Sequence, residues 1–310
     1  MKIARRAVDG VLLLDKHADL SSNSAVGWSK RLFNAEKAGH TGTLDPFATG
    51  LLPICFGEAA KFARFMLDAD KGYRATLKLG ERSSTGDTEG EIISRRPVNV
   101  DCAQVDEILR SFLGARTQVP PMHSALKQDG VPLYKLARQG VEVERPPRDI
   151  VVYSLVQVSL DGNQLVIDTR VSKGTYIRVL AEDIGEALGC GAYLTALRRT
   201  ATGGFGVSQA VTFEQLDAMS MAERDAVLLA PDALAMALPS LQLDSQQASA
   251  LQNGQVPRFA VALPDQAEYR VYGDGGRFMG IARTAATAEA GCLLIAVRLM
   301  SGVATLPENA

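Results

Sequence analysis

The part of the chain best suited to chemistry is residues 39–50, which read GHTGTLDPFATG. Its one carboxylate, Asp45, is a candidate nucleophile, because a carboxylate is ionised at neutral pH and needs no activating base. Pro46 fixes its own φ and pushes Asp45 toward an extended conformation, and the glycines allow left-handed angles or close approach to a ligand. The sequence therefore predicts a stiff loop that presents a nucleophile, with an ordinary solvated aspartate as the alternative.

Residues 119–148 form the one markedly basic stretch of the chain. Lys127, Lys135 and Arg138 alternate there with Tyr134 and apolar side chains. Cations interleaved with an aromatic ring are typical of a surface that contacts nucleic acid. Charge alone, however, equally fits a solvated insertion.

Apolar periodicity predicts the elements that must hold these residues. A buried strand at 11–14 leads to a helix capped by Ser21 or Ser22, and residues 58–68 have the spacing of an amphipathic helix. Strict alternation over residues 73–79 predicts a half-buried strand that begins at Tyr73. The other predicted elements before residue 231 are a helix capped by Asp101, a hairpin of 150–160 with 164–171, a helix from Ile177, and short helices capped by Thr212 and Ser220.

The pattern changes after Pro231 and Pro239, which mark a predicted domain boundary. Beyond it we expect one short helix at 244–252, ended by Asn253 and Gly254. Short strands are expected at 259–263, 269–272, 278–283 and 293–299. We therefore predict two domains, residues 1–238 and 239–310, the second small and rich in strand.

Composition sets only broad bounds on function. The 310 residues are 46% apolar and 22% charged, with a formal net charge of −2, so RNA binding would have to come from local clusters of cations. No apolar run approaches the ~20 residues that span a bilayer, and we expect a cytoplasmic protein. The four cysteines are widely spaced and predict neither disulfides nor a zinc site.

Four separate motifs resemble, in order, those of the TruB family of pseudouridine synthases. They are the loop around Asp45, residues 120–138, the SKGTYIR sequence at 172–178, and Leu-Arg-Arg at 197–199. The resemblance implies an α+β catalytic domain with a mixed, largely antiparallel sheet and packed helices, a basic RNA-gripping insertion at about 120–150, and a C-terminal PUA-like domain. At residues 17 and 19 the chain has His17 and Asp19 where the family usually has Pro and Gly.

The resemblance also implies roles for individual residues. Asp45 is the catalytic aspartate, Arg178 pairs with it through a fork that lysine could not reproduce, and Tyr73 packs against the target base. His40, Tyr176, Leu197 and Lys16 are the other implied substrate-binding residues. The implied RNA-binding residues are Lys61, Lys127, Lys135 and Arg138.

The implied reaction isomerises uridine 55 in the T-loop of tRNA to pseudouridine. The T-arm of tRNA is then the partner, and we expect a monomer with no obligate protein partner. Because the reaction neither gains nor loses atoms or electrons, no cofactor and no metal are expected. The target base must leave its stack before it can react.

Two other functions fit part of the sequence. A haloacid-dehalogenase-type hydrolase also uses an aspartate after an apolar strand, but it needs a second carboxylate two residues on, where this chain has Phe47. A non-catalytic RNA-binding protein on the same scaffold is the second, and the presence of both Asp45 and Arg178 argues against it.

Overall fold

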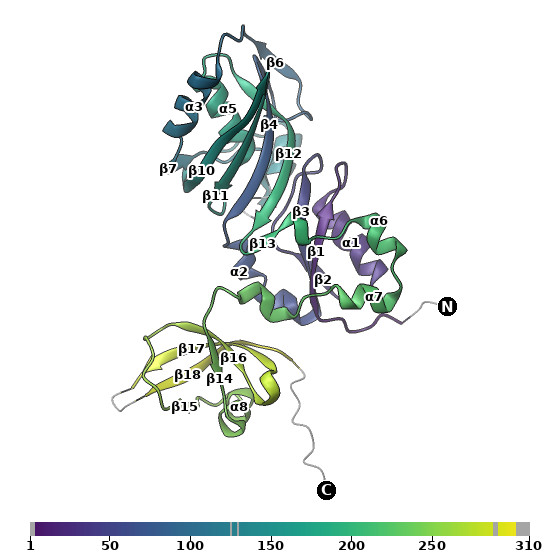
Figure 1. Cartoon of the computed structure of the whole chain (residues 1–310), viewed down its shortest axis with the longest axis vertical. Helices are drawn as coiled ribbons and strands as arrows, with labels where there is room; N and C mark the ends of the chain where they lie inside the picture. The colour runs from purple at the N-terminus through teal and green to yellow at the C-terminus, as the bar shows by residue number, and fades with distance from the viewer. Residues whose placement is uncertain (1–3, 125, 129, 288–290, 302–310) are drawn as a thin grey trace.

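The structure, a computed structural model, describes residues 4–124, 126–128, 130–287 and 291–301. Two sheets dominate these residues, and they lie one above the other along the long axis of the molecule (Figure 1). The larger sheet has nine strands and the smaller has five. The last strand of the large sheet ends at Gly206, and the first strand of the small sheet begins at Ser240.

The large sheet is mixed, as predicted. Its main path runs β1-β3-β12-β4-β11-β10-β7, with β2 beside β3 and β13 beside β12. Only the β12–β3 pair in this sheet is parallel among the described residues. The strands are β1 (Gly10–Lys16), β2 (Ala38–His40), β3 (Thr49–Phe56), β4 (Lys71–Leu79), β7 (Gly114–Gln118), β10 (Arg148–Asp161), β11 (Gln164–Val171), β12 (Ala192–Thr202) and β13 (Phe205–Gly206).

The parallel β12–β3 contact brings the loop that carries Asp45 against a distant part of the chain. The loop joins β2 to β3, and Gly50 at the start of β3 pairs with Arg199 of β12. A Cβ atom on Gly50 would lie 2.3 Å from the Arg199 carbonyl oxygen, and its φ is +100°. Glycine is therefore required here for the close approach of the two backbones.

Two helices, α3 (Cys102–Ser111) and α5 (Ile177–Ala187), lie on the same side of the strands in Figure 1 and pack against each other. Asp101 and Gln104 form a capping box at α3, as the sequence predicts. The capping boxes at Thr212 and Ser220 are also present, at the starts of α6 (Phe213–Ala218) and α7 (Met221–Ala226).

The predicted helix at 58–68 is wrong in type. The segment is a 3-10 helix, η1 (Gly57–Phe62), followed by the single turn α2 (Arg64–Leu67). Three side chains of its predicted apolar face, Ala59, Phe62 and Met66, are nevertheless buried in the cluster that lies between the two sheets.

The turn before α1 (Ser22–Leu32) has Asp19 where the family motif has glycine. Asp19 takes a φ of 62°, the left-handed region that glycine adopts most easily and aspartate tolerates better than most residues. His17 is exposed and packs against the Phe213 ring, with centroids 4.7 Å apart. Ser21 then caps α1 by accepting a hydrogen bond from the Ser24 amide.

The C-terminal sheet confirms the predicted small β-rich unit. Its order is β14-β16-β17-β18-β15, with α8 (Ser245–Gln252) packed against it. The strands are β14 (Ser240–Gln242), β15 (Arg258–Phe259), β16 (Glu268–Tyr272), β17 (Phe278–Ala286) and β18 (Cys292–Leu299). The strand predicted at 259–263 shrinks to the two residues of β15. No helix in the described residues is long and apolar enough to cross a membrane.

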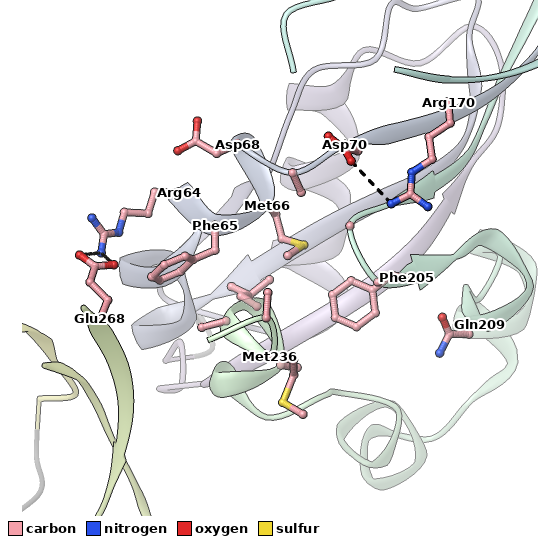
Figure 2. A pocket seen from close by; sticks show the side chains of 17 residues that line it. Arg64, Phe65, Met66, Asp68, Asp70, Arg170, Phe205, Gln209, Met236 and Glu268 are labelled. Carbon is pink, nitrogen blue, oxygen red and sulfur yellow. Dashed lines mark hydrogen bonds and ion pairs between the residues drawn. The ribbon is translucent and has the colours of Figure 1, made fainter. Parts of the chain in front are cut away.

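The two sheets share an apolar cluster and several polar contacts. The Phe62 and Phe278 rings meet edge to face at 5.1 Å, and Arg64 forms an ion pair with Glu268 at 2.7 Å. This ion pair borders a cavity of about 840 Å³, shown in Figure 2, whose lining comes from residues 64–237 except for Glu268 of the second sheet. None of the predicted site residues lines that cavity, and a truncation at Leu238 would expose the shared cluster to water.

Candidate active site

Asp45 lies at the turn of the β2–β3 loop and faces a cavity of about 390 Å³. Ser22 binds both backbone polar groups of Leu44, the residue before Asp45. Its hydroxyl accepts a hydrogen bond from the Leu44 amide at 2.8 Å and donates to the Leu44 carbonyl at 2.9 Å. The Asp45 carbonyl also accepts from the Ala48 amide, so the carboxylate projects from a loop that is fixed on both flanks.

Arg178 meets Asp45, as the family resemblance implies, from the first turn of α5. Its Nε lies 3.2 Å from Asp45 Oδ2, and its side chain is only 6% exposed. The remaining nitrogens are held by an ion pair to Asp87 at 3.3 Å and by the carbonyls of Thr85 and His123. A planar guanidinium bound at this many points fixes the direction of the Asp45 carboxylate.

The predicted site residues did not include Asp87. This carboxylate is buried, accepts hydrogen bonds from the Thr85 hydroxyl and the Glu89 amide, and shares Arg178 with Asp45. The only signal in the sequence is the Thr-Gly-Asp turn at 85–87. Asp87 positions Arg178 through an ion pair, and the two residues are 91 positions apart in the sequence. No local sequence pattern indicates a contact of this kind.

Opposing effects set the charge of Asp45. Burial raises the pKa of the carboxyl, Arg178 lowers it, the neighbouring Asp87 raises it, and Lys16 lowers it. Burial has the largest effect, and the net shift is upward. Among these interactions, Arg178 is the one that most favours the ionised form of Asp45.

The geometry gives no support to the implied binding of substrate by Lys16, which stays a prediction. Its side chain is fully buried, and its three ammonium hydrogens are directed to the carbonyls of His17, Leu20 and Pro46. Burial lowers its pKa to about 8. The contact to Pro46 shows that Lys16 braces the loop next to Asp45.

Arg199 and Lys71 are further cations near the site that sequence reasoning did not single out. Arg199 is 1% exposed and donates to the carbonyls of Leu51, Gly42 and Thr43, so it ties β12 to the Asp45 loop. Lys71 is also buried and donates to the carbonyls of Met66, Leu67 and Ala69. Both line the cavity that Asp45 faces.

The walls of this cavity include three of the predicted substrate-binding side chains, Tyr73, Tyr176 and Leu197. Tyr73 comes from β4 and Leu197 from the adjacent strand β12. Tyr176 precedes α5, and its amide and carbonyl are both bound by the Gln118 side chain. Two aromatic rings and an aliphatic side chain beside a carboxylate form a site suited to one planar base.

His40 lies outside this cavity. It ends β2 half-buried, and its Nδ1 accepts a hydrogen bond from the Gly42 amide. Burial, together with the charge of Arg199, lowers the pKa of His40 and favours the neutral ring. Its contact with displaced RNA bases stays a prediction.

The basic insertion lies beside Asp45. It consists of the hairpin β8 (Lys127–Gln128) and β9 (Val131–Pro132) followed by α4 (Leu133–Arg138). Lys127, Lys135 and Arg138 are exposed. Arg138 and Tyr134 line a second cavity of about 350 Å³ that also reaches Asp45, and the predicted contact of these cations with RNA stays a prediction.

Lys61 has a different environment from the other predicted RNA-binding residues. Its ammonium donates to Glu58, the Leu299 carbonyl and the Ser301 hydroxyl, at the junction of the two sheets. All three donors are thus engaged within the chain, and this geometry gives no support to RNA binding by Lys61. Among the described residues, no group of three His, Cys, Asp or Glu side chains is placed to hold a metal ion.

Comparison with known proteins identifies related chains. Family models described as TruB family pseudouridylate synthase (N-terminal domain), tRNA pseudouridylate synthase B C-terminal domain, and pseudouridine synthase II TruB, C-terminal, match residues 30–177, 178–238 and 239–290. A tRNA pseudouridine synthase B of Neisseria gonorrhoeae is 52% identical over 98% of both chains. The protein of that name from Thiobacillus denitrificans is 50% identical over 95% of this chain and 97% of its own.

Solved structures show the same fold at much lower identity. The match titled Crystal Structure of a Cbf5-Nop10-Gar1 Complex has a TM-score of 0.73 at 23% identity, covering 94% of this chain and 84% of that one. A structure of an H/ACA RNP bound to a substrate RNA matches with a TM-score of 0.70 at 21% identity, over 94% of this chain and 84% of that one.

Proposed function

The chain belongs to the TruB family of pseudouridylate synthases, and from this premise we propose that it isomerises uridine 55 in the T-loop of tRNA to pseudouridine. The observation that carries the proposal is the Asp45–Arg178 pair at the wall of a base-sized cavity lined by Tyr73, Tyr176 and Leu197. Relatives that are 50% and 52% identical to the chain are named tRNA pseudouridine synthase B. Family membership also removes the dehalogenase-type alternative.

The reaction balances without a co-reactant. The bond from N1 of the uracil to C1′ of the ribose breaks, and a bond from C5 to C1′ forms. The proton on C5 is lost and N1 gains one, so product and substrate are isomers. Asp45 supplies the nucleophilic oxygen that the uridine needs for this exchange.

The other residues prepare Asp45 and hold the base. Arg178 favours the ionised carboxylate and orients it, and Asp87 forms a second ion pair that holds Arg178 in place. Tyr73, Tyr176 and Leu197 enclose the flipped uracil, which has lost its stacking partners in the RNA. Tyr73 is our candidate for the group that removes the C5 proton.

The direct test is incubation of the pure protein with unmodified tRNA transcript, followed by mapping of pseudouridine at single-nucleotide resolution. We expect one modified position, at nucleotide 55. A transcript with cytidine at that position serves as the control and should stay unmodified. Absence of pseudouridine from a well-folded protein and tRNA would refute the proposed function.

We propose that the insertion at about 120–150 grips the phosphates of the T-arm. Neutralising Lys127, Lys135 and Arg138 to glutamine should then weaken tRNA binding, because each lost phosphate contact reduces the release of counterions. The slope of log Kd against log salt should fall by about two to three units in magnitude. Binding titrations at several salt concentrations measure it.

The control for this prediction is neutralisation of two exposed arginines outside the insertion, Arg95 and Arg110, which are 73% exposed. Their loss should leave the slope nearly unchanged. If the triple variant keeps the slope of the unmodified protein, the insertion charges are a solvated surface.

We propose that residues 1–238 form the catalytic domain and 239–310 an RNA-binding domain, with a monomer as the active unit. A domain that touches only distant parts of tRNA contributes equal binding in the ground and transition states. Replacing the exposed Arg277, Arg283 and Arg298 by glutamine should therefore raise KM about three- to tenfold and leave kcat unchanged.

A short T-arm hairpin provides the matched substrate for this variant. The hairpin cannot reach the second domain, so both proteins should modify it equally well. Surface substitution avoids exposing the apolar cluster that a truncation at Leu238 would uncover. A variant with a reduced kcat on the hairpin would contradict the separation of roles.

A further inference from the structure

Asp45 lies between two cavities, and five residues line both of them. The first cavity holds the aromatic walls described above, and the second opens toward Arg138 and Tyr134. The residues common to both are Thr43, Leu44, Asp45, Ser124 and Arg178. Ser124 is the member of this set that the mechanism has not used.

The Ser124 hydroxyl is buried without a hydrogen bond. The residue is 5% exposed, and its Oγ has no hydrogen-bond partner among the described residues. The Tyr176 phenol lies within reach of a hydrogen bond to this hydroxyl and competes for it, but the two oxygens do not meet in the geometry of a formed hydrogen bond. Buried polar groups are nearly always bonded, and an exception calls for a missing partner.

The backbone around Ser124 is fixed. Its amide donates to the Met122 carbonyl at 2.9 Å, and its carbonyl accepts from the Tyr134 amide at 3.1 Å. The carbonyl of the preceding His123 accepts from Arg178 at 2.6 Å. The hydroxyl is therefore held in place relative to both Arg178 and the insertion, and only its own rotation is free.

Other polar side chains of the first cavity are already bound. Thr175 donates to the Ser172 carbonyl, and Lys71 and Arg199 are directed to backbone carbonyls. Ser172 Oγ accepts from the Val151 amide. A ligand in this cavity thus finds in Ser124 a hydroxyl that can both donate and accept.

We propose that the Ser124 hydroxyl hydrogen-bonds the polar edge of the flipped uracil and holds the base while it turns. This inference rests on the proposed function. After its bond to the ribose breaks, the uracil must rotate by half a turn about the N3–C6 axis to bring C5 to the former position of N1. That rotation exchanges the positions of the O2 and O4 carbonyls and leaves the N3–H group between them. The Ser124 hydroxyl, which can rotate, therefore finds a hydrogen-bond partner on the uracil both before and after the rotation.

The test uses Ser124→Ala and a T-arm hairpin under single-turnover conditions with saturating enzyme. We expect the rate of pseudouridine formation to fall about three- to tenfold, as for one lost neutral hydrogen bond, with the Kd for the hairpin unchanged. Ser29→Ala is the matched control, because Ser29 is equally buried and unbonded but lies in α1, outside both cavities. It should retain the unmodified rate.

The free protein provides a second readout. Removing an unbonded hydroxyl should leave Tm unchanged or raised. A fall in Tm of several degrees would show that Ser124 already has a partner within the free chain, and would overturn the proposal.

Modified substrates identify the contact. Hairpins with 4-thiouridine or 2-thiouridine at the target carry a weaker hydrogen-bond acceptor at one edge position. Replacing oxygen by sulfur should lower the single-turnover rate of the unmodified enzyme on at least one of these hairpins. On that hairpin, the fold-decrease should be smaller for Ser124→Ala, which has already lost the contact. If the effects of sulfur and of Ser124→Ala on the rate are independent for both hairpins, the proposed contact is refuted.

The unmodified enzyme separates this inference from the proposed function. If it forms no pseudouridine in the natural hairpin, the function itself is wrong and the inference falls with it. If it forms pseudouridine and Ser124→Ala does so at the same rate, only the role of Ser124 is wrong.

Discussion

Asp45→Asn is expected to bind tRNA normally and to lose turnover by about 10⁴-fold or more. Asparagine keeps the size and shape of the side chain but lacks the negative charge and the nucleophilic oxygen, and the loss of a nucleophile typically has effects of this order. The loop should keep its structure, because Ser22 and Arg199 hold its backbone and not the carboxylate. Single-turnover assays with saturating enzyme measure the rate, and filter binding measures the affinity.

Asp19→Asn is the matched control for this prediction. It makes the same chemical change on an exposed loop, and asparagine tolerates the φ of 62° found there. The control should keep full activity. Turnover by Asp45→Asn within tenfold of the unmodified enzyme would remove Asp45 from the role of nucleophile.

Arg178→Met should shift the pH dependence of the reaction as well as slow it. Arg178 is the strongest of the interactions that lower the pKa of Asp45 against the effect of burial. Without it the pKa of Asp45 rises further, so the reactive ionised form is lost over a wider range of acidic pH. The acid limb of the pH–rate profile should move to higher pH, and the rate at pH 7 should fall roughly a hundredfold.

The same variant has a predicted effect on stability. With Arg178 gone, the folded state favours the protonated form of Asp45 more than the unfolded chain does. Folding then takes up a proton, so the variant should be least stable relative to the unmodified protein at neutral and alkaline pH and recover as the pH falls. Thermal melts between pH 5 and pH 8 measure this.

Arg178→Lys is the conservative comparison. Lysine keeps the positive charge, so the acid limb of the pH–rate profile should move less than in Arg178→Met. Lysine lacks, however, the planar guanidinium that joins Asp45, Asp87 and two carbonyls. A pH profile for Arg178→Met that coincides with that of the unmodified enzyme would show that the charge of Asp45 does not depend on Arg178.

The sequence was sufficient for features that depend on neighbouring residues. The caps at Ser21, Asp101 and Thr212 and the alternation of β4 are local patterns, and the structure confirms them. The meeting of Asp45 with Arg178 was also predicted, but from the family resemblance and not from periodicity. The sequence alone offered no reason to place these two residues together.

The features that the sequence missed depend on distant backbone. Lys16 is buried because a carbonyl of the Asp45 loop, 30 residues away, completes its set of acceptors. Lys61 has its contacts at the C-terminal sheet, 238 residues away. An isolated lysine in a sequence gives no sign of such carbonyls, and solvent is its usual environment.

The buried cations around Asp45 act as pre-oriented sources of positive potential that are shielded from solvent. Lys16, Lys71 and Arg199 are surrounded by backbone carbonyls that the fold holds in place, so their surroundings need not reorient when negative charge builds up on the reacting uridine. Dissolved ions also screen such interior charges far less than exposed ones. Salt should therefore weaken the proposed binding of tRNA by the exposed insertion, and leave the electrostatic field at the reacting atoms largely unchanged.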